Sequence, residues 1–348
     1  MAGAGGGVVA EGALFPDKLH FALFWTYVAL FVNQGILVTA SKEADGSYSY
    51  NTTTVVLLTE LIKLLLAAYL YLREHQFHFG RLAKEWRAEL RLGALYLVPA
   101  FLYCLYNNLA FVNLRHYDPA SYFLLLNFRT VLTGVIFQVL FKKTLSRRQW
   151  LALVILTLGC IVKQVEMDNL SSIRIRIDFH LLLMLLQVFC SCFAGVYNEF
   201  LLKDTGAGVH LQIQNLFMYG NSILMNLAFM GLEGSLVKAF TEEAVSSVLR
   251  PGVLAIAVNN GVAGITTSLF LKNFNSILKT FAGAIELILT ALVAWVLFGV
   301  AVNVFMSASI ALVSVAMYLY STQPVNNKEK TPVLPSKAKD AEPLLSTA

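Results

Sequence analysis

The sequence predicts an all-α polytopic membrane protein whose ten transmembrane helices form an inverted repeat of five plus five. Three observations lead to this prediction. The 348 residues are 57% hydrophobic and 14% charged, whereas about a quarter of the residues of a soluble domain are charged. Apolar segments of about 18 residues or more recur along the chain, and each can cross about 30 Å of hydrocarbon. Two of these segments align with one another.

The apolar segments set the domain organisation. They are predicted at 19–39, 53–73, 92–114, 119–141, 147–166, 179–203, 211–232, 251–272, 276–298 and 301–321. A ten-helix domain over 19–321 thus lies between an N-terminal segment, 1–18, and a polar tail, 322–348, whose composition predicts disorder. The first segment lacks the basic start and apolar core of a cleavable signal peptide, so we expect the first span to direct insertion.

The basic residues predict the orientation in the lipid bilayer. They concentrate in loops 73–91 and 142–148 and in the tail, and such loops normally face the cytosol. Both termini are therefore expected in the cytosol. Two N-glycosylation sequons, at Asn51 and Asn169, fall in loops on the opposite, lumenal side. Topology also accounts for the net charge of +5, so nucleic acid is not expected as a partner.

Loop 73–91 has two interpretations. It could form an amphipathic helix on the membrane surface that turns its large apolar residues toward lipid: Phe77, Phe79, Leu82, Trp86 and Leu90. Alternatively, it is a short basic loop that only sets the topology.

The internal repeat divides the domain into halves. Residues 114–141 align with 271–298: each stretch begins with leucine and a cation, continues through a polar turn and ends in Leu-Phe. One more span follows each stretch, which gives halves of about 19–166 and 179–321. Because each half has an odd number of helices, the halves have opposite orientations. This plan is typical of secondary transporters, with the substrate site near the midplane between the halves.

Charged residues inside the predicted spans indicate a binding site. A charge at the bilayer centre costs roughly 2.5–3.5 kcal/mol on insertion scales, so it usually faces a cavity or a partner. Arg129 and Lys279 lie on corresponding helices of the two halves and can converge on one anion, such as a diphosphate. The repeat also aligns Arg129 with Glu286. In the alternative interpretation Glu286 neutralises Arg129 and leaves Lys279 alone for the ligand.

Other charges have local partners at helical spacing. Glu60 and Lys63 are three residues apart, and Glu199 and Lys203 are four apart. Side chains at these spacings face one another on a helix. We therefore expect both pairs to form within their own helices.

Polar residues on neighbouring spans complete the candidate pocket. Amides can bind a base edge, tyrosines can stack on a ring, and hydroxyls can bind ribose. The alternative is that such residues join helices to one another. The polar residues taken as substrate ligands are Asn108, Tyr122, Tyr197, Asn215, Tyr219 and Ser268.

Features of an enzyme were not found in the sequence. The cysteines lie within predicted spans and are interpreted as small apolar core residues. Neither a metal-ligand spacing, a Walker loop nor a catalytic His/Asp/Ser arrangement lies in or beside the spans. We expect no metal, no cofactor and no catalytic residue.

Several segments resemble the nucleotide-sugar transporter family of the CMP-sialic acid and UDP-galactose type. They are LYNNLAFVNLRHYDPASYFLLLNFR, KKTLSRRQW, CFAGVYNEFLLK, IQNLFMYGNS and NFNSILKTFAGA. The resemblance implies the drug/metabolite transporter fold and alternating-access antiport across the Golgi membrane. A nucleotide sugar, expected to be UDP-galactose, would enter the lumen while the nucleoside monophosphate UMP leaves. The resemblance leaves formation of a homodimer open.

The resemblance also implies roles for individual residues. Asn108 and Tyr219 correspond to base-binding residues, with Asn215 one turn before Tyr219. Tyr122 corresponds to a tyrosine early in the fourth helix. The phosphate-binding lysines of the family fall on Arg129 and Lys279. The glycine of the FAGVY segment falls on Gly195, where close packing or approach of the ligand needs a small residue.

Two departures from the family pattern concern the same site. Asn127-Phe128-Arg129 stands where the family usually has Gln-Leu-Lys, and arginine can bind phosphate through two parallel hydrogen bonds. Glu286 occupies a position that is apolar in related transporters, and it is a candidate gating residue or charge partner of Arg129.

Two other functions share this fold. One is a carrier of another nucleotide sugar or of an organic phosphate, and an organic phosphate would use the cations without base recognition. The other is a membrane scaffold, which would need neither. In the tail, DAEPLL from Asp340 to Leu345 resembles an acidic dileucine signal for a sorting adaptor. Its alternative is a solvated cytosolic segment.

Overall fold

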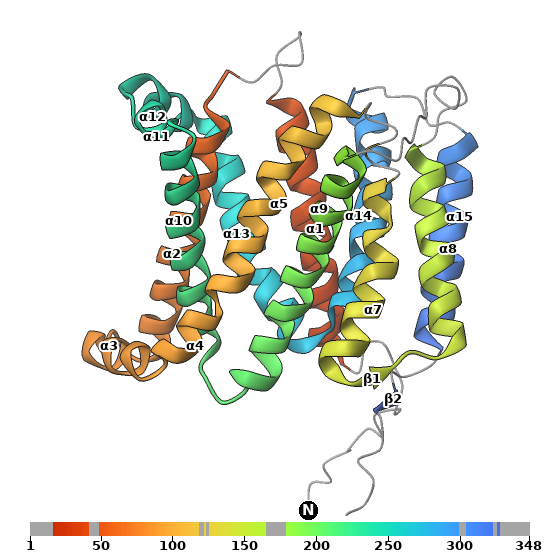
Figure 1. Ribbon diagram of the computed structural model, residues 1–348, viewed down its shortest axis with the longest axis horizontal. Helices are drawn as coiled ribbons and strands as arrows, with labels where there is room; N and C mark the ends of the chain where they lie inside the picture. The colour runs from red at the N-terminus through yellow and green to blue at the C-terminus, as the bar shows by residue number, and fades with distance from the viewer. Residues whose placement is uncertain are drawn as a thin grey trace, which may run out of the picture.

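The computed structural model describes residues 17–41, 49–117, 122, 125–164, 179–298, 304–322 and 326–327. Figure 1 shows long helices that run side by side in one bundle. The long helices are α1 Lys18–Ala40, α2 Thr52–Glu74, α5 Leu97–His116, α7 Arg129–Phe141, α8 Arg147–Gln164, α9 Phe179–Phe200, α10 Leu211–Leu232, α13 Pro251–Asn273, α14 Ser276–Phe298 and α15 Val304–Ser321. The predicted polytopic, helical membrane protein is thereby confirmed.

Seven helical segments in the described part of the chain are long and apolar enough to cross a membrane. They are Lys18–Ala40, Thr52–Glu74, Leu90–Ala110, Phe179–Thr205, Pro251–Asn273, Ser276–Leu297 and Val304–Ser321. Leu125–Phe141 is a shorter apolar helix. Helices α8 and α10 are not among these seven segments. Helix α8 begins with two arginines, and the glutamines and asparagines of α10 lower its mean hydropathy. Each predicted span coincides with a helix, but the ten-span plan itself stays a prediction.

Short elements lie at both ends of the long helices. They are α3 Phe79–Ala88, α4 Leu90–Leu95, the π-helical turn η2 Leu201–Thr205, α11 Leu236–Ala239 and α12 Glu242–Val248. The strands β1 Lys143–Thr144 and β2 Asn326–Asn327 form one antiparallel pair. Among the described residues, this strand pair is the one departure from the predicted all-α fold. Strand β2 lies in the segment predicted as the polar tail.

Loop 73–91 contains the amphipathic helix α3. Phe79 and Trp86 on this helix are exposed, while Leu82 packs against a buried cluster of α2, α4 and α10. The Trp86 ring stacks on Phe217 of α10, with ring centroids 5.7 Å apart. Arg81 donates a 2.7 Å hydrogen bond to Glu85 and lowers the pKa of that carboxyl. The segment therefore contains a helix and is not a plain loop, but Leu82 and Trp86 pack against the bundle, not toward lipid as the surface-helix interpretation expects.

The helices of the two predicted halves are interleaved. Helix α1 packs against α13 and α14, α5 against α9 and α10, and α2 against α10 and α13. Helix α7 packs against α9, and α8 packs against α15 at one edge of the bundle (Figure 1). The largest buried cluster joins α1, α7, α8, α9, α13, α14 and α15. Contacts between the halves, more than contacts within them, thus surround the centre of the bundle.

Candidate functional site

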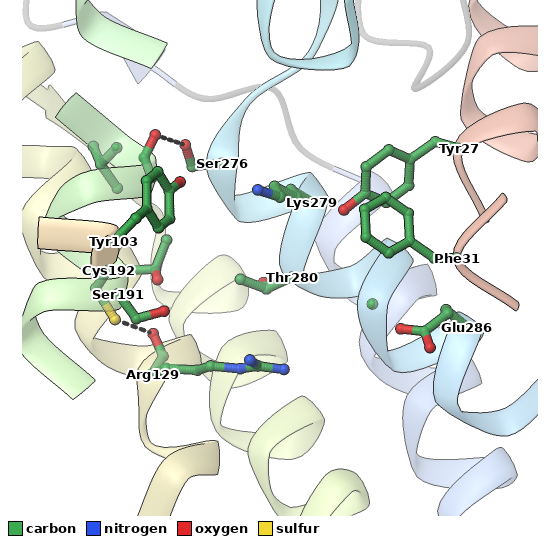
Figure 2. A pocket seen from close by; sticks show the side chains of 14 residues that line it. Tyr27, Phe31, Tyr103, Arg129, Ser191, Cys192, Ser276, Lys279, Thr280 and Glu286 are labelled. Carbon is green, nitrogen blue, oxygen red and sulfur yellow. Dashed lines mark hydrogen bonds between the residues drawn. The ribbon is translucent and has the colours of Figure 1, made fainter. Parts of the chain in front are cut away.

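A cavity of about 260 Å³ lies among α1, α5, α7, α9 and α14. Figure 2 shows its polar side chains converging from these helices. The lining residues are Tyr27, Phe31, Tyr103, Arg129, Thr133, Ser191, Cys192, Gly195, Val196, Ser276, Lys279, Thr280, Gly283 and Glu286. It is called the central cavity below.

The two cations singled out in the sequence meet in the central cavity. Arg129 comes from α7 and Lys279 from α14, and both side chains point into the cavity (Figure 2). The convergence predicted from their places on corresponding helices is therefore present. Two positive charges in a weakly polar surrounding repel one another, and an anion bound between them is attracted to both. Such a pair therefore favours an anionic ligand.

The backbone is irregular directly before Arg129. A turn at Phe128 interrupts the helix that runs over Leu125–Phe141. The Phe128 N–H donates a 3.2 Å hydrogen bond to the carbonyl of Leu125, three residues back, whereas an α-helix has such bonds to the fourth residue back. Discontinuous membrane helices commonly form transporter sites, since the break exposes polar backbone groups to the ligand. Here the carbonyl of Arg129 accepts a 3.2 Å hydrogen bond from Cys192 Sγ.

Glu286 lines the same cavity as Arg129 and Lys279. Within the described residues, the ion pairs closer than 4.0 Å do not include one between Arg129 and Glu286. The interpretation in which a direct bridge to Glu286 neutralises Arg129 is therefore not the arrangement found. The cavity carries two cationic residues and one acidic residue, which favours an anionic ligand.

Gly195 lies on the α9 wall of the central cavity. A Cβ atom at this position would have Tyr103 Oη at 3.7 Å as its neighbour, which is ordinary contact. Close packing of helices therefore does not require glycine here, and that part of the expectation is wrong. The other part of the expectation, space for a ligand, stays a prediction.

Three other predicted ligands lie in a second polar cluster between α2, α10 and α13. Lys63 pairs with Glu60, as predicted, and its Nζ lies 5.1 Å from the centre of the Tyr219 ring. Asn215 donates to Gln212 Oε1 at 3.0 Å, and Ser268 donates to Ile265 O at 2.8 Å. These residues do not line the central cavity as described.

The remaining predicted ligands also lie elsewhere. Asn108 lines a separate cavity of about 660 Å³ between α2, α5 and α10, and its amide donates to Cys104 O at 2.9 Å. The Tyr122 hydroxyl accepts a 2.8 Å hydrogen bond from Gln187. The Tyr197 ring stacks on Phe193 at 5.5 Å. The structure thus brings Arg129, Gly195 and Lys279 together and leaves the proposed base ligands apart from them.

Sequence reasoning missed several residues of the central cavity. Ser276 lies three residues before Lys279 on the same face of α14, so helical spacing could have identified it. Thr280 follows Lys279 directly, and helical spacing gives no such signal for it. Tyr27 and Phe31 come from an apolar stretch of α1 and have no local signal that separates them from core residues.

The other predicted sites were also located. All four cysteines are free and buried, as expected of core residues. In the described part of the chain, no cluster of three or more His, Cys, Asp or Glu residues could hold a metal. Asn51 is the N-cap of α2, and its side chain accepts hydrogen bonds from Thr53 N and Thr54 N at 3.1 Å. Asn169 and the segment from Asp340 to Leu345 lie outside the described residues.

The chain is similar to known transporters over most of its length. It is 47% identical to the UDP-galactose transporter senju of Drosophila melanogaster, covering 91% of this chain and 90% of the fly protein. It is 30% identical to CMP-sialic acid transporter 1 of Oryza sativa subsp. japonica, covering 84% of this chain and 91% of the rice protein. A crystal structure with 16% sequence identity has a similar fold, with a TM-score of 0.61 over 86% of this chain and 94% of that chain.

The family model described as nucleotide-sugar transporter matches residues 21–321, from the first turn of α1 to the last residue of α15. This range contains the central cavity and every predicted ligand. The protein belongs to the nucleotide-sugar transporter family.

Proposed function

We propose that this protein exchanges UDP-galactose for UMP across the Golgi membrane by alternating access. The observation that carries the proposal is the pair Arg129 and Lys279 in the central cavity of a chain that is 47% identical to a UDP-galactose transporter. A diphosphate has two phosphoryl groups for these cations. UMP retains one of them, so both exchanged ligands can use the same site.

The proposed architecture is ten spans in two inverted halves, about 19–166 and 179–321. In this plan α1, α2, α5, α7 and α8 correspond to α9, α10, α13, α14 and α15. The helix contacts support the plan because they occur as symmetry-related pairs. Contact α1–α13 corresponds to α9–α5, α1–α14 to α9–α7, and α2–α13 to α10–α5, while α2–α10 and α8–α15 correspond to themselves.

We further propose roles for the residues around the cavity. Arg129 and Lys279 bind phosphate, and Gly195 leaves room for the ligand beside them. Asn108, Asn215 and Tyr219 contact the base, while Tyr122, Tyr197 and Ser268 contribute to the sugar end. These groups lie in separate clusters in this structure.

The proposed orientation has both termini in the cytosol. The basic segments with α3 and β1 lie at one end of the bundle, and α12 lies at the other (Figure 1). This distribution supports the orientation expected from the positive charges. Homodimer formation and binding of a sorting adaptor at Asp340 to Leu345 stay predictions.

Exchange in liposomes tests the proposed function. Purified protein is placed in vesicles loaded with UMP, CMP or GMP, and uptake of labelled UDP-galactose, UDP-N-acetylglucosamine, CMP-sialic acid and GDP-mannose is measured. Uptake of UDP-galactose that requires internal UMP is the expected result. Uptake of an organic phosphate without dependence on the base would favour another carrier, and no exchange by folded protein would favour a scaffold.

A further inference from the structure

A buried carboxylate on α9 holds the beginning of α14, the helix that carries Lys279. The Glu199 side chain is 1% exposed, and its Oε2 accepts hydrogen bonds from Ser276 N at 2.7 Å and Ser276 Oγ at 2.6 Å. Its Oε1 accepts a 2.8 Å hydrogen bond from Lys203. The first amide of α14 thus has a charged acceptor from another helix.

The connector before α14 is tied to the same place. Lys203 Nζ also donates to Phe274 O in the link between α13 and α14. Asn275 Oδ1 accepts a 2.7 Å hydrogen bond from Leu278 N. The first amides of a helix lack partners inside it, and a nearby negative charge also stabilises its positive N-terminus. Glu199 and Asn275 supply those partners, and Lys203 ties Glu199 to the connector at Phe274, so the three residues fix where α14 begins.

Stability alone gives a weak reason for this ion pair. Burying two charges costs about as much as their attraction returns, and apolar replacements are often as stable. The π-helix η2 begins at Leu201, two residues after Glu199, and Lys203 belongs to that turn. π-Helical turns are rare in proteins, and those that occur often lie at functional sites. In this case the turn lies where Lys203 reaches both Glu199 and Phe274.

The anchored residue and the cation share one face of α14. Ser276 and Lys279 are three residues apart, and both line the central cavity (Figure 2). Ser276 Oγ also lies 3.4 Å from the carbonyl of Gly195 on the opposite wall. Rotation or fraying of the first turn of α14 would therefore carry Lys279 away from the ligand.

We propose that Glu199 is a positioning residue of the substrate site: by anchoring the first turn of α14 to α9, it keeps Lys279 directed into the central cavity. The proposal rests on the function proposed above for the ligand that Lys279 binds. Glu199 itself does not line the cavity as described and contacts no ligand in this mechanism.

A double-mutant cycle separates positioning from general stability. UMP binding to the purified full-length protein is measured for Glu199→Ala, Lys279→Met and the double variant. We expect Glu199→Ala to weaken UMP binding roughly tenfold, and the double variant to bind no more weakly than Lys279→Met, since coupled residues are not additive. Glu199→Gln keeps an oxygen for Ser276 and should recover part of the affinity.

Glu85→Ala is the matched control, because Glu85 also accepts from a cation four residues away but lies on the exposed helix α3. Its UMP affinity should equal that of the unaltered protein. Unchanged affinity in Glu199→Ala, or an equal further loss in the Lys279→Met background, would overturn the positioning role.

A second measurement does not depend on the ligand. Hydrogen exchange of the amides at the start of α14 should be faster in Glu199→Ala than in Glu85→Ala. Equal exchange in the two variants would show that Glu199 does not anchor this turn. If the unaltered protein binds neither UMP nor UDP-galactose, the proposed function fails. The hydrogen-exchange comparison still tests whether Glu199 anchors the first turn of α14.

Discussion

Replacement of Gly264 by alanine should destabilise the contact between α2 and α13. A Cβ atom at Gly264 would lie 2.3 Å from Lys63 Cδ and 3.0 Å from Lys63 Cγ, so the lysine side chain has to move. That side chain pairs with Glu60 and lies against the Tyr219 ring. Glu60 Oε2 is buried and already lacks a hydrogen-bond partner among the described residues.

Two limits bracket the cost of Gly264→Ala. If Lys63 only bends to a strained rotamer, the cost is about 1 kcal/mol. If it leaves Glu60, a mostly buried carboxylate loses its partner, which costs about 3–5 kcal/mol. The two side chains are 16% and 13% exposed, so solvent screens a small part of the interaction. We therefore expect a loss of about 2–4 kcal/mol in the free energy of unfolding.

Thermal unfolding in detergent measures this loss. A matched control is Gly252→Ala, on the same helix, where no atom lies within 4 Å of the added Cβ. In the Lys63→Ala background the clashing atoms are gone, so Gly264→Ala should add almost no destabilisation there. Equal unfolding temperatures for Gly264→Ala and Gly252→Ala would refute the steric argument.

Three further predictions test other parts of the molecule. Glu286→Gln removes the negative charge from the central cavity and should tighten UMP binding by up to about tenfold, and unchanged affinity would contradict this. Gly93→Ala places a Cβ atom 2.5 Å from the Phe217 ring, so thermal unfolding should show a loss of about 1–3 kcal/mol from overpacking. Gln187→Leu removes the acceptor of a 2.7 Å hydrogen bond from buried Asn113, which should cost about 1–3 kcal/mol in the same assay; an unaltered unfolding temperature would count against it.

Helix positions could be predicted well because hydropathy and helix-start signals are local. The prediction of a helix over 211–232 matches α10, and Pro251 begins α13 as proline does at a first helical turn. The break between α4 and α5 at Tyr96 was not predicted, although the sequence marks it: Pro99 has no backbone N–H to donate to the carbonyl of Leu95, so the helix is interrupted before it. Paired charges at helical spacing, Glu60–Lys63 and Glu199–Lys203, were predicted and are confirmed.

The candidate site could be predicted only in part. The repeat placed Arg129 and Lys279 on corresponding helices of the two halves, and both line one cavity. Tyr122 contacts Gln187, and the Tyr219 ring lies against Lys63. Both partners are distant in sequence from the tyrosines they contact. One sequence has no signal for such contacts, since polar side chains that join helices and those that bind ligands have the same composition. The roles assigned to Asn108 and Asn215 stay predictions.

The position of Cys192 gives the protein a built-in reporter of access. Its thiol lies on the cavity wall against the Arg129 carbonyl, whereas the other three cysteines line neither described cavity. An alkylating reagent that cannot cross the bilayer would reach Cys192 only from the side to which the cavity is open. The rate of labelling from each side, with and without UMP, would therefore test the proposed alternating access without any engineered probe.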